Sequence, residues 1–180
     1  GAGAGGAGAQ RERAEAGDIL VFLPGAADVE ACCDMRRDDP AAPELVVLPL
    51  YAQLPKHLQV RVFERPPRAP ARKVVVATSI AETSVTLDGV RFVVDSGFAK
   101  LPFVHRELGV ELLAVVPCSR ASASQRAGRA GRTAPGECYR LYTEAALRGG
   151  LMPRETPPEF ERAPLAGALL QLKALGIDKV

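Results

Sequence analysis

The stretch of this chain best suited to chemistry runs from residue 125 to residue 132 and reads QRAGRAGR. Arginine is always charged, and its planar fork of donors matches phosphate oxygens. On a helix, Gln125, Arg129 and Arg132 fall at positions i, i+4 and i+7, which share one face. Two guanidinium groups beside an amide that can hold a water are what phosphoryl transfer requires. A solvated basic helix is the alternative for a lone arginine pair, but the full octapeptide after a Ser/Ala run favours chemistry.

A second stretch, residues 77–90, reads ATSIAETSVTLDGV and follows an apolar run. Small hydroxyl residues at the end of a strand expose oxygens and N–H groups where a phosphate chain can lie. Serine and threonine in such turns are usually local caps, which is the alternative for this stretch alone. Its occurrence together with the arginine stretch favours a phosphate-binding role.

Apolar runs bounded by turn residues predict the strands that must position both stretches. We predict strands over residues 18–23, 45–50, 73–78, 90–95 and 137–142. Helices are predicted over residues 26–37 and 55–63, and a short helical turn is predicted from Ala81. A further helix is predicted to begin at a Ser119 cap and to continue through the arginine stretch. Tyr139 and Tyr142 are interpreted as strand packing. Alternating strands and helices predict an α/β fold whose parallel sheet is covered on both faces, with ligand sites at the carboxyl ends of the strands.

Two further segments do not fit that alternation. Residues 98–104 and 110–116 flank a polar tip and predict a β-hairpin. Residues 149–162 are rich in Pro, Gly and charge, and residues 163–175 then predict a helix that ends at Gly176. We therefore expect a Gly/Ala-rich linker over residues 1–17, a domain over 18–148, and a linker with the first helix of an incomplete module over 149–180.

Composition restricts the class of protein. Of the 180 residues, 47% are hydrophobic, which is enough for a sizeable core. The net charge of +2 does not indicate nucleic-acid binding by itself, but four arginines fall in residues 120–132 without an acidic residue. The four cysteines form no CxxC pair, which is typical of reduced thiols inside cells. No apolar run is long enough to span a membrane.

Three stretches together resemble a known family. ATSIAETSVTLDGV, VVDSGFAK (residues 93–100) and SRASASQRAGRAGRTAPGECYRLYTE (residues 119–144) resemble the second RecA-like lobe of a DEAH-box RNA helicase of superfamily 2. The resemblance spans residues 18–180, and residues 152–180 resemble the entry into that family's winged-helix domain. It implies a RecA-like parallel sheet with helices on both faces and an inserted β-hairpin.

The resemblance also implies roles at a nucleotide site. Arg129 and Arg132 would be the arginine fingers that meet the γ-phosphate of ATP, and Gln125 would help position the attacking water. Phe63 would stack on adenine; the alternative is a core phenylalanine on an amphipathic helix. Asp88 is similar to the family's acidic residue near ribose and phosphate, and Ser84 to its nucleotide-sensing hydroxyl.

A separate set of residues would contact RNA. The resemblance places the RNA backbone against Gly25, Tyr51, Ala52, Thr78 and Ser79, and it identifies the hairpin of residues 98–116 with the strand-separating hairpin of the family. At Ala52 and Ser79 the family usually has serine and asparagine, so this chain lacks the side chains usual there.

The cofactor implied is ATP with Mg²⁺, and the partners implied are RNA, the first RecA-like lobe and splicing or ribosome-assembly factors. No GxxxxGK[ST] loop and no DEAH tetrapeptide occurs in the chain, so we expect the metal ligands in a first lobe and no ATP hydrolysis by this chain alone. The chain begins at Gly1 rather than Met, and we expect a fragment of an intracellular helicase, with the nucleus favoured over the cytoplasm. Two alternatives are a non-catalytic RNA- or protein-binding module that keeps the lobe, and another doubly wound nucleotide-binding protein.

Overall fold

The computed structural model describes residues 17–37, 45–64, 71–105, 110–132, 134–162 and 166–177. The predicted linker over residues 1–16 and the tip of the predicted hairpin lie outside these ranges. The predictions for the sheet, the helices that cover it and the stem of the hairpin can all be compared with the structure.

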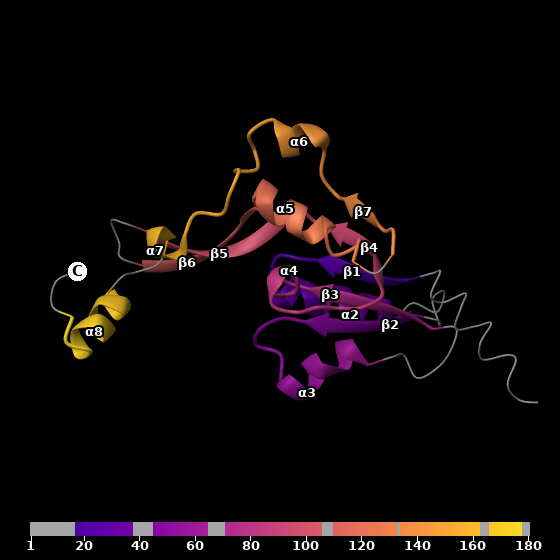
Figure 1. Ribbon diagram of the computed structural model, residues 1–180, viewed down its shortest axis with the longest axis horizontal. Helices are drawn as coiled ribbons and strands as arrows, with labels where there is room; N and C mark the ends of the chain where they lie inside the picture. The colour runs from indigo at the N-terminus through magenta and orange to yellow at the C-terminus, as the bar shows by residue number, and fades with distance from the viewer. Residues whose placement is uncertain are drawn as a thin grey trace, which may run out of the picture.

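A parallel sheet of five strands forms the centre of the molecule (Figure 1). Its order is β2-β3-β1-β4-β7. The strands are β1 (Asp18–Phe22), β2 (Leu45–Leu50), β3 (Arg72–Ala77), β4 (Val90–Asp95) and β7 (Glu137–Arg140). Every neighbouring pair in this sheet is parallel, as the continuous apolar runs predict.

Strand β7 is shorter than predicted. The sequence predicts a strand over residues 137–142, whereas β7 ends at Arg140. One more backbone bond follows, from the Leu141 N–H to the Asp95 carbonyl at 2.9 Å, and the chain then leaves the sheet. Tyr142 is not strand packing as predicted, because its hydroxyl donates to the buried Asp95 carboxylate at 2.8 Å. Tyr139 is not strand packing either: it is exposed, and its hydroxyl donates to Glu137.

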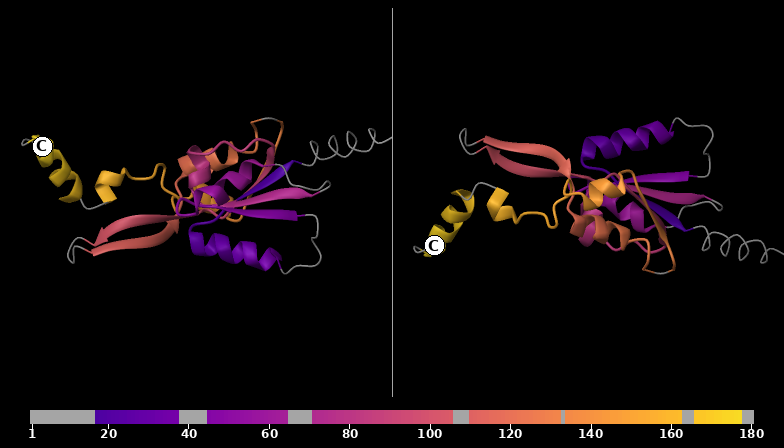
Figure 2. Two further views of the ribbon diagram at one scale, coloured as in Figure 1. Left: turned by 90° about the horizontal axis from the view of Figure 1, so that it is seen from below. Right: turned by 90° about the horizontal axis from the view of Figure 1, so that it is seen from above.

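Helices cover both faces of the sheet (Figure 2). Alternate residues of β1 belong to the core clusters on the two faces, with Leu20 and Phe22 in one and Ile19 and Val21 in the other. Helix α2 (Ala26–Arg37) packs through Val29 and Cys33 on one face. The other face is covered by α3 (Lys56–Gln59), the 3₁₀ helix η1 (Val60–Phe63), α4 (Ile80–Thr83) and α5 (Arg120–Ala127), with Val62, Ala81 and Ala130 in its core. The predicted fold class, a RecA-like α/β sheet with helices on both faces and an inserted hairpin, is confirmed.

The hairpin consists of β5 (Phe98–His105) and β6 (Val110–Pro117) and projects away from the sheet (Figure 2). Its register pairs Phe98 with Pro117 at the base and His105 with Val110 at the outer end. At the base, Ala99 and Cys118 are buried together with Ala123 of α5 and Met152. The inserted hairpin is therefore anchored on α5, the helix that leads into the arginine stretch.

The C-terminal part contains three short helices: α6 (Glu144–Arg148), α7 (Glu159–Arg162) and α8 (Ala166–Ala174). Helix α6 was not predicted; Thr143 caps it by accepting from the Ala146 N–H at 3.1 Å. The predicted cap of the last helix is confirmed, because Gly176 has a φ of 80° and Ile177 N–H bonds Leu172 at 3.0 Å. The division of the chain at residue 149 stays a prediction. Among the described helices, none is long and apolar enough to cross a membrane.

Gly97 holds the turn between β4 and β5, and we expect Gly97→Ala to lower the free energy of unfolding by about 2 kcal/mol or more. Its φ is 80°, and an added Cβ would lie 2.5 Å from Cδ1 of Tyr142. Urea denaturation of the chain measures this effect. The control is Gly131→Ala, where an added Cβ meets nothing within 4 Å; a change at Gly97 no larger than at Gly131 would contradict the prediction.

Candidate nucleotide and RNA site

The arginine stretch begins on helix α5 but leaves it before the two arginines of interest. The predicted cap is confirmed, since the Ser119 hydroxyl accepts from the Ser122 N–H at 3.1 Å. The helix ends at Ala127, however, with Gly128 as its C-cap. Only Gln125 therefore lies on it, and the predicted helical face shared with Arg129 and Arg132 is wrong. Glycine favours helix poorly, which accounts for the early end.

After α5 the backbone continues in tight turns. Arg129 N–H bonds Arg126 carbonyl at 3.0 Å, and Ala130 N–H bonds Ala127 carbonyl at 3.1 Å. Ala130 is buried against the sheet, which holds this turn in place between the two arginines. Packing of Ala130, rather than helical periodicity, thus positions Arg129 and Arg132.

Among the residues that the structure describes, the guanidinium of Arg129 has donors without hydrogen-bond partners. Within the described part of the chain, its Nε and Nη1 atoms are buried and have no hydrogen-bond partner. Burial lowers the pKa of its guanidinium, the charge of Arg132 lowers it further, and the charge of Glu82 opposes both. Buried donors without acceptors are costly and rare, so this guanidinium is suited to an anion that approaches from outside.

Arg132 reaches the second chemical stretch. Its Nη1 donates to the Thr86 hydroxyl at 3.0 Å, which joins the arginine segment to the segment before β4. Ser84, at the C-cap of α4, and Asp88, in the turn before β4, are both exposed on either side of Thr86. In the described ranges, no hydrogen bond or ion pair links Ser84 or Asp88 to an arginine. Thr86 was missed as a site residue, although it belongs to the stretch that the sequence singled out.

Phe63 is exposed, so the alternative of a core phenylalanine is wrong. Its exposed fraction is 56%, whereas that of its neighbour Val62 is 0%. Val62 and Ala130 belong to the same core cluster, so the segments carrying Phe63 and Arg129 cover the same face of the sheet. An exposed ring on that face is available for stacking, and its contact with adenine stays a prediction.

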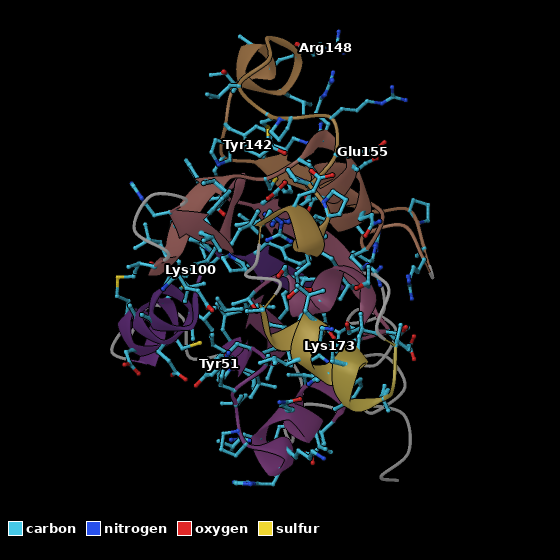
Figure 3. The ribbon with its side chains drawn as sticks, turned by 90° about the vertical axis from the view of Figure 1, so that its left-hand side faces the viewer. Tyr51, Lys100, Tyr142, Arg148, Glu155 and Lys173 are labelled. Atoms are coloured by element: carbon cyan, nitrogen blue, oxygen red, sulfur yellow. The ribbon has the colours of Figure 1, made fainter. Side chains whose placement is uncertain are left out.

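The predicted RNA-contacting residues gather at the carboxyl edge of the sheet. Backbone bonds tie the strand ends together: Leu23 N–H to Ala77 carbonyl at 2.9 Å, Thr78 N–H to Leu50 carbonyl at 3.1 Å, and Ser96 N–H to Phe22 carbonyl at 3.3 Å. This edge thus includes Gly25, Tyr51, Ala52, Thr78 and Ser79, of which Ala52 and Ser79 are exposed. Tyr51 and Lys100 both lie on this side of the molecule in Figure 3.

Side chains from two neighbouring helices hold the loop after β2. Gln59 Nε2 donates to the carbonyls of Leu54 at 2.7 Å and of Ala52 at 3.3 Å. Tyr51 hydroxyl donates to Glu30 Oε1 at 2.6 Å, and this bond, followed by burial and the charge of Glu30, raises the pKa of Tyr51. Contacts to α2 and α3 therefore fix the conformation of the loop, and these contacts leave its solvent-facing side uncovered.

A buried ion network of Arg126, Glu82 and Asp95 joins α5, α4 and β4, and it was not predicted from the sequence. Arg126 Nε bonds Glu82 Oε1 at 2.8 Å, and its Nη1 bonds Asp95 Oδ1 at 2.7 Å. Burial alone would lower the pKa of this guanidinium, but the charges of Glu82 and Asp95 raise it above its usual value. Arg126 falls in the same octapeptide as Arg129 and Arg132, yet it is 1% exposed. The octapeptide thus contains one buried arginine that is fully paired (Arg126), one half-buried arginine with two nitrogens unpartnered among the described residues (Arg129) and one exposed arginine (Arg132).

Cys118 lies beside this network, in the wall of a cavity of about 250 Å³ that Ser79, Glu82, Leu101, Phe103 and Ser122 also line. Burial raises the pKa of its thiol to about 11 from 9.0. The thiolate is the reactive form, so at pH 8 alkylation by iodoacetamide should be about a hundredfold slower than in the urea-unfolded chain. Peptide mass spectrometry resolves the rate at each cysteine, and equal folded and unfolded rates at Cys118 would contradict this.

The region suits a phosphate group better than a metal ion on its own. No group of three or more His, Cys, Asp or Glu residues that could hold a metal occurs among the residues that the structure describes. Arg129 and Arg132 instead offer donors to phosphate oxygens. ATP bound with Mg²⁺ therefore fits these residues at its phosphates.

Comparisons with known proteins agree with this geometry. A family model described as the helicase conserved C-terminal domain matches residues 9–134. The chain is 48% identical over 167 residues to the pre-mRNA-splicing factor ATP-dependent RNA helicase prp22 of Schizosaccharomyces pombe, covering 90% of this chain and 14% of that protein. It is 50% identical over 171 residues to the probable ATP-dependent RNA helicase DHX35 of Pongo abelii, covering 91% of this chain and 23% of that protein.

A solved structure gives the same result. The crystal structure of the E. coli DExH-box NTPase HrpB superposes with a TM-score of 0.77 at 32% identity, covering 96% of this chain and 21% of that one. The chain thus spans less than a quarter of each of these proteins. It belongs to the helicase conserved C-terminal domain family, and its resemblance to the second lobe of a DEAH-box RNA helicase is confirmed.

Proposed function

We propose that this chain is the second motor lobe of an ATP-dependent RNA helicase, supplying arginine fingers to ATP and contacts to the RNA backbone. One observation carries the proposal: Arg129 holds two buried guanidinium nitrogens without partners, in the same loop as Arg132. Such a group is stabilised when a phosphate arrives and is costly when none does. It is therefore suited to an anion that a separate body brings to it.

The arginines act on phosphates that a first RecA-like lobe presents. Arg129 and Arg132 neutralise charge on the γ-phosphate when the lobes close, which couples hydrolysis to motion. Thr86 orients Arg132 through its hydroxyl at 3.0 Å. Gln125, exposed on the last turn of α5, positions the attacking water. ATP with Mg²⁺ supplies the phosphate to be transferred, and the metal ligands belong to the first lobe.

The other nucleotide contacts come from the same face of the sheet and the segment before β4. The exposed ring of Phe63 stacks on adenine, Asp88 lies near ribose and phosphate, and the Ser84 hydroxyl senses the nucleotide. These assignments are supported by the exposure of all three side chains.

RNA lies along the carboxyl edge of the sheet. Thr78 and Ser79 contact its backbone together with the main chain at Gly25, Tyr51 and Ala52, and the β5–β6 hairpin separates strands. Contacts to the backbone alone make binding dependent on salt and indifferent to sequence. Residues 149–180 form the entry to a winged-helix module.

A relative's name suggests where the helicase acts. The protein prp22 is described as a pre-mRNA-splicing factor. We therefore propose a nuclear role with splicing factors as partners, ahead of ribosome-assembly factors.

The test is the ATP hydrolysis rate of a polypeptide that joins this chain to a first RecA-like lobe, measured with and without single-stranded RNA. We expect the joined polypeptide to hydrolyse ATP and RNA to stimulate that hydrolysis. We expect the chain alone to show no hydrolysis. RNA binding without hydrolysis in the joined polypeptide would contradict the proposal and favour a non-catalytic module that keeps the lobe.

A further inference from the structure

We infer that Arg126 is a positioning residue that ties the base of the β5–β6 hairpin to the segment carrying Gln125 and Arg129, so that movement of the hairpin on RNA shifts the arginine fingers. The inference rests on the proposed function and adds a residue that is buried, with 1% of its surface exposed. Arg126, the inward-facing arginine of the octapeptide, thereby couples the RNA-binding hairpin to the nucleotide site.

The contacts of Arg126 reach three separate elements. Its Nε bonds Glu82 of α4 at 2.8 Å, and its Nη1 bonds both Asp95 at the end of β4, at 2.7 Å, and the carbonyl of Phe98, at 3.1 Å. Phe98 is the first residue of the hairpin. The guanidinium also lies over the Phe22 ring, 5.1 Å from its centroid. One side chain of α5 thus holds α4, the central sheet and the hairpin base together.

Both carboxylates are fully engaged, which makes the network rigid. The second oxygen of Glu82 accepts from the Ser122 hydroxyl at 2.6 Å, and that of Asp95 accepts from Tyr142 hydroxyl at 2.8 Å. Gly97 N–H, in the turn into the hairpin, donates to Asp95 Oδ1 at 2.9 Å. Hydrogen-bonded buried networks of this kind have few alternative arrangements, so a shift at one member displaces the others.

The network reaches Arg129 in two ways. Arg129 N–H bonds Arg126 carbonyl at 3.0 Å, so the backbone of the finger follows that of Arg126. Glu82 attracts both guanidinium groups, because its charge helps to raise the pKa of Arg126 and opposes the lowering of the Arg129 pKa by burial and by Arg132. Displacing the hairpin base therefore changes both the position of Arg129 and the charge that faces it.

A second buried ion pair provides a control that is structural only. Lys73 bonds Asp18 at 3.3 Å and the Val62 carbonyl at 2.8 Å. It joins β3 to β1 and η1, and among the described residues it makes no hydrogen bond or ion pair to the hairpin or α5. Asp18→Asn weakens this pair by removing its negative charge, and it serves as a destabilising substitution away from the proposed connection.

The experiment compares the ATP hydrolysis rate with RNA to the rate without RNA, in the polypeptide joined to a first RecA-like lobe. Tyr142→Phe removes one hydroxyl that supports Asp95, and Arg126→Lys keeps the charge but loses the fork. We expect each to lower the ratio about tenfold, the size expected for one lost hydrogen bond to a charged group. Asp18→Asn should lower the melting temperature and leave the ratio within about twofold.

Three results would contradict the inference. A Tyr142→Phe ratio equal to that of the unaltered protein would overturn the inference, even if Arg126→Lys does not fold. An Asp18→Asn ratio that falls as far as that of Tyr142→Phe would overturn it too, because loss of stability would then explain both. Absence of RNA stimulation in the unaltered protein would instead overturn the proposed function, and this inference with it.

Discussion

Arg129→Ala is expected to lower the RNA-stimulated rate of ATP hydrolysis by about a thousandfold or more, the usual contribution of an arginine finger. The same substitution should not destabilise the lobe. In the absence of nucleotide, the Nε and Nη1 atoms of Arg129 are buried without partners, so removing them removes a cost of burial. We therefore expect an unfolding free energy equal to or above that of the unaltered chain, measured by urea denaturation.

Two further variants make this prediction specific. Arg129→Lys keeps the charge without the planar fork and should recover only a small part of the rate. Arg120→Ala removes an exposed arginine at the start of the same helix and should leave the rate within about twofold. An unchanged ATP hydrolysis rate in Arg129→Ala would contradict the assignment of Arg129 as an arginine finger. A decrease of several kcal/mol in its unfolding free energy would contradict it too.

The sheet could be predicted because its signal is local. Runs such as Val74, Val75 and Val76 indicate a strand buried on both faces wherever they occur, and helix α2 follows its strand with the predicted bounds. The loops at the carboxyl edge follow from parallel topology alone. The hairpin stem could be predicted as well, since apolar residues on both sides of a polar tip indicate strand pairing.

The interior of the site could not be predicted, because its partners are far apart in sequence. Arg126 bonds Glu82 across 44 positions and Asp95 across 31. No periodicity marks such a pair, and an arginine in a basic octapeptide suggests exposure rather than burial. The helical face expected for Arg129 failed for a different reason: Gly128 ends α5, and the packing of Ala130 then sets the course of the chain.

Arg126→Met is expected to lower the free energy of unfolding by about 3–5 kcal/mol, because it leaves two buried carboxylates without their shared cation. Asp95 is 0% exposed and cannot regain water without opening the lobe, and the side chain of Glu82 is only 12% exposed. Typical domains are stable by about 5–15 kcal/mol, so this loss is a large fraction of the whole. Urea denaturation of the chain measures it directly.

Two comparisons separate charge burial from lost packing. Arg148→Met breaks the exposed pair with Glu144, which has a similar 2.8 Å separation, and should cost less than about 1 kcal/mol. The triple variant Arg126→Met, Glu82→Gln and Asp95→Asn removes all three charges and should recover part of the stability that Arg126→Met alone loses. If the triple variant is less stable than Arg126→Met, the guanidinium contributes through hydrogen bonds and packing, and the unpaired carboxylates are not the cause. If it is more stable, the two buried carboxylates are the cause of the loss, and Arg126 stabilises the fold by compensating their charge.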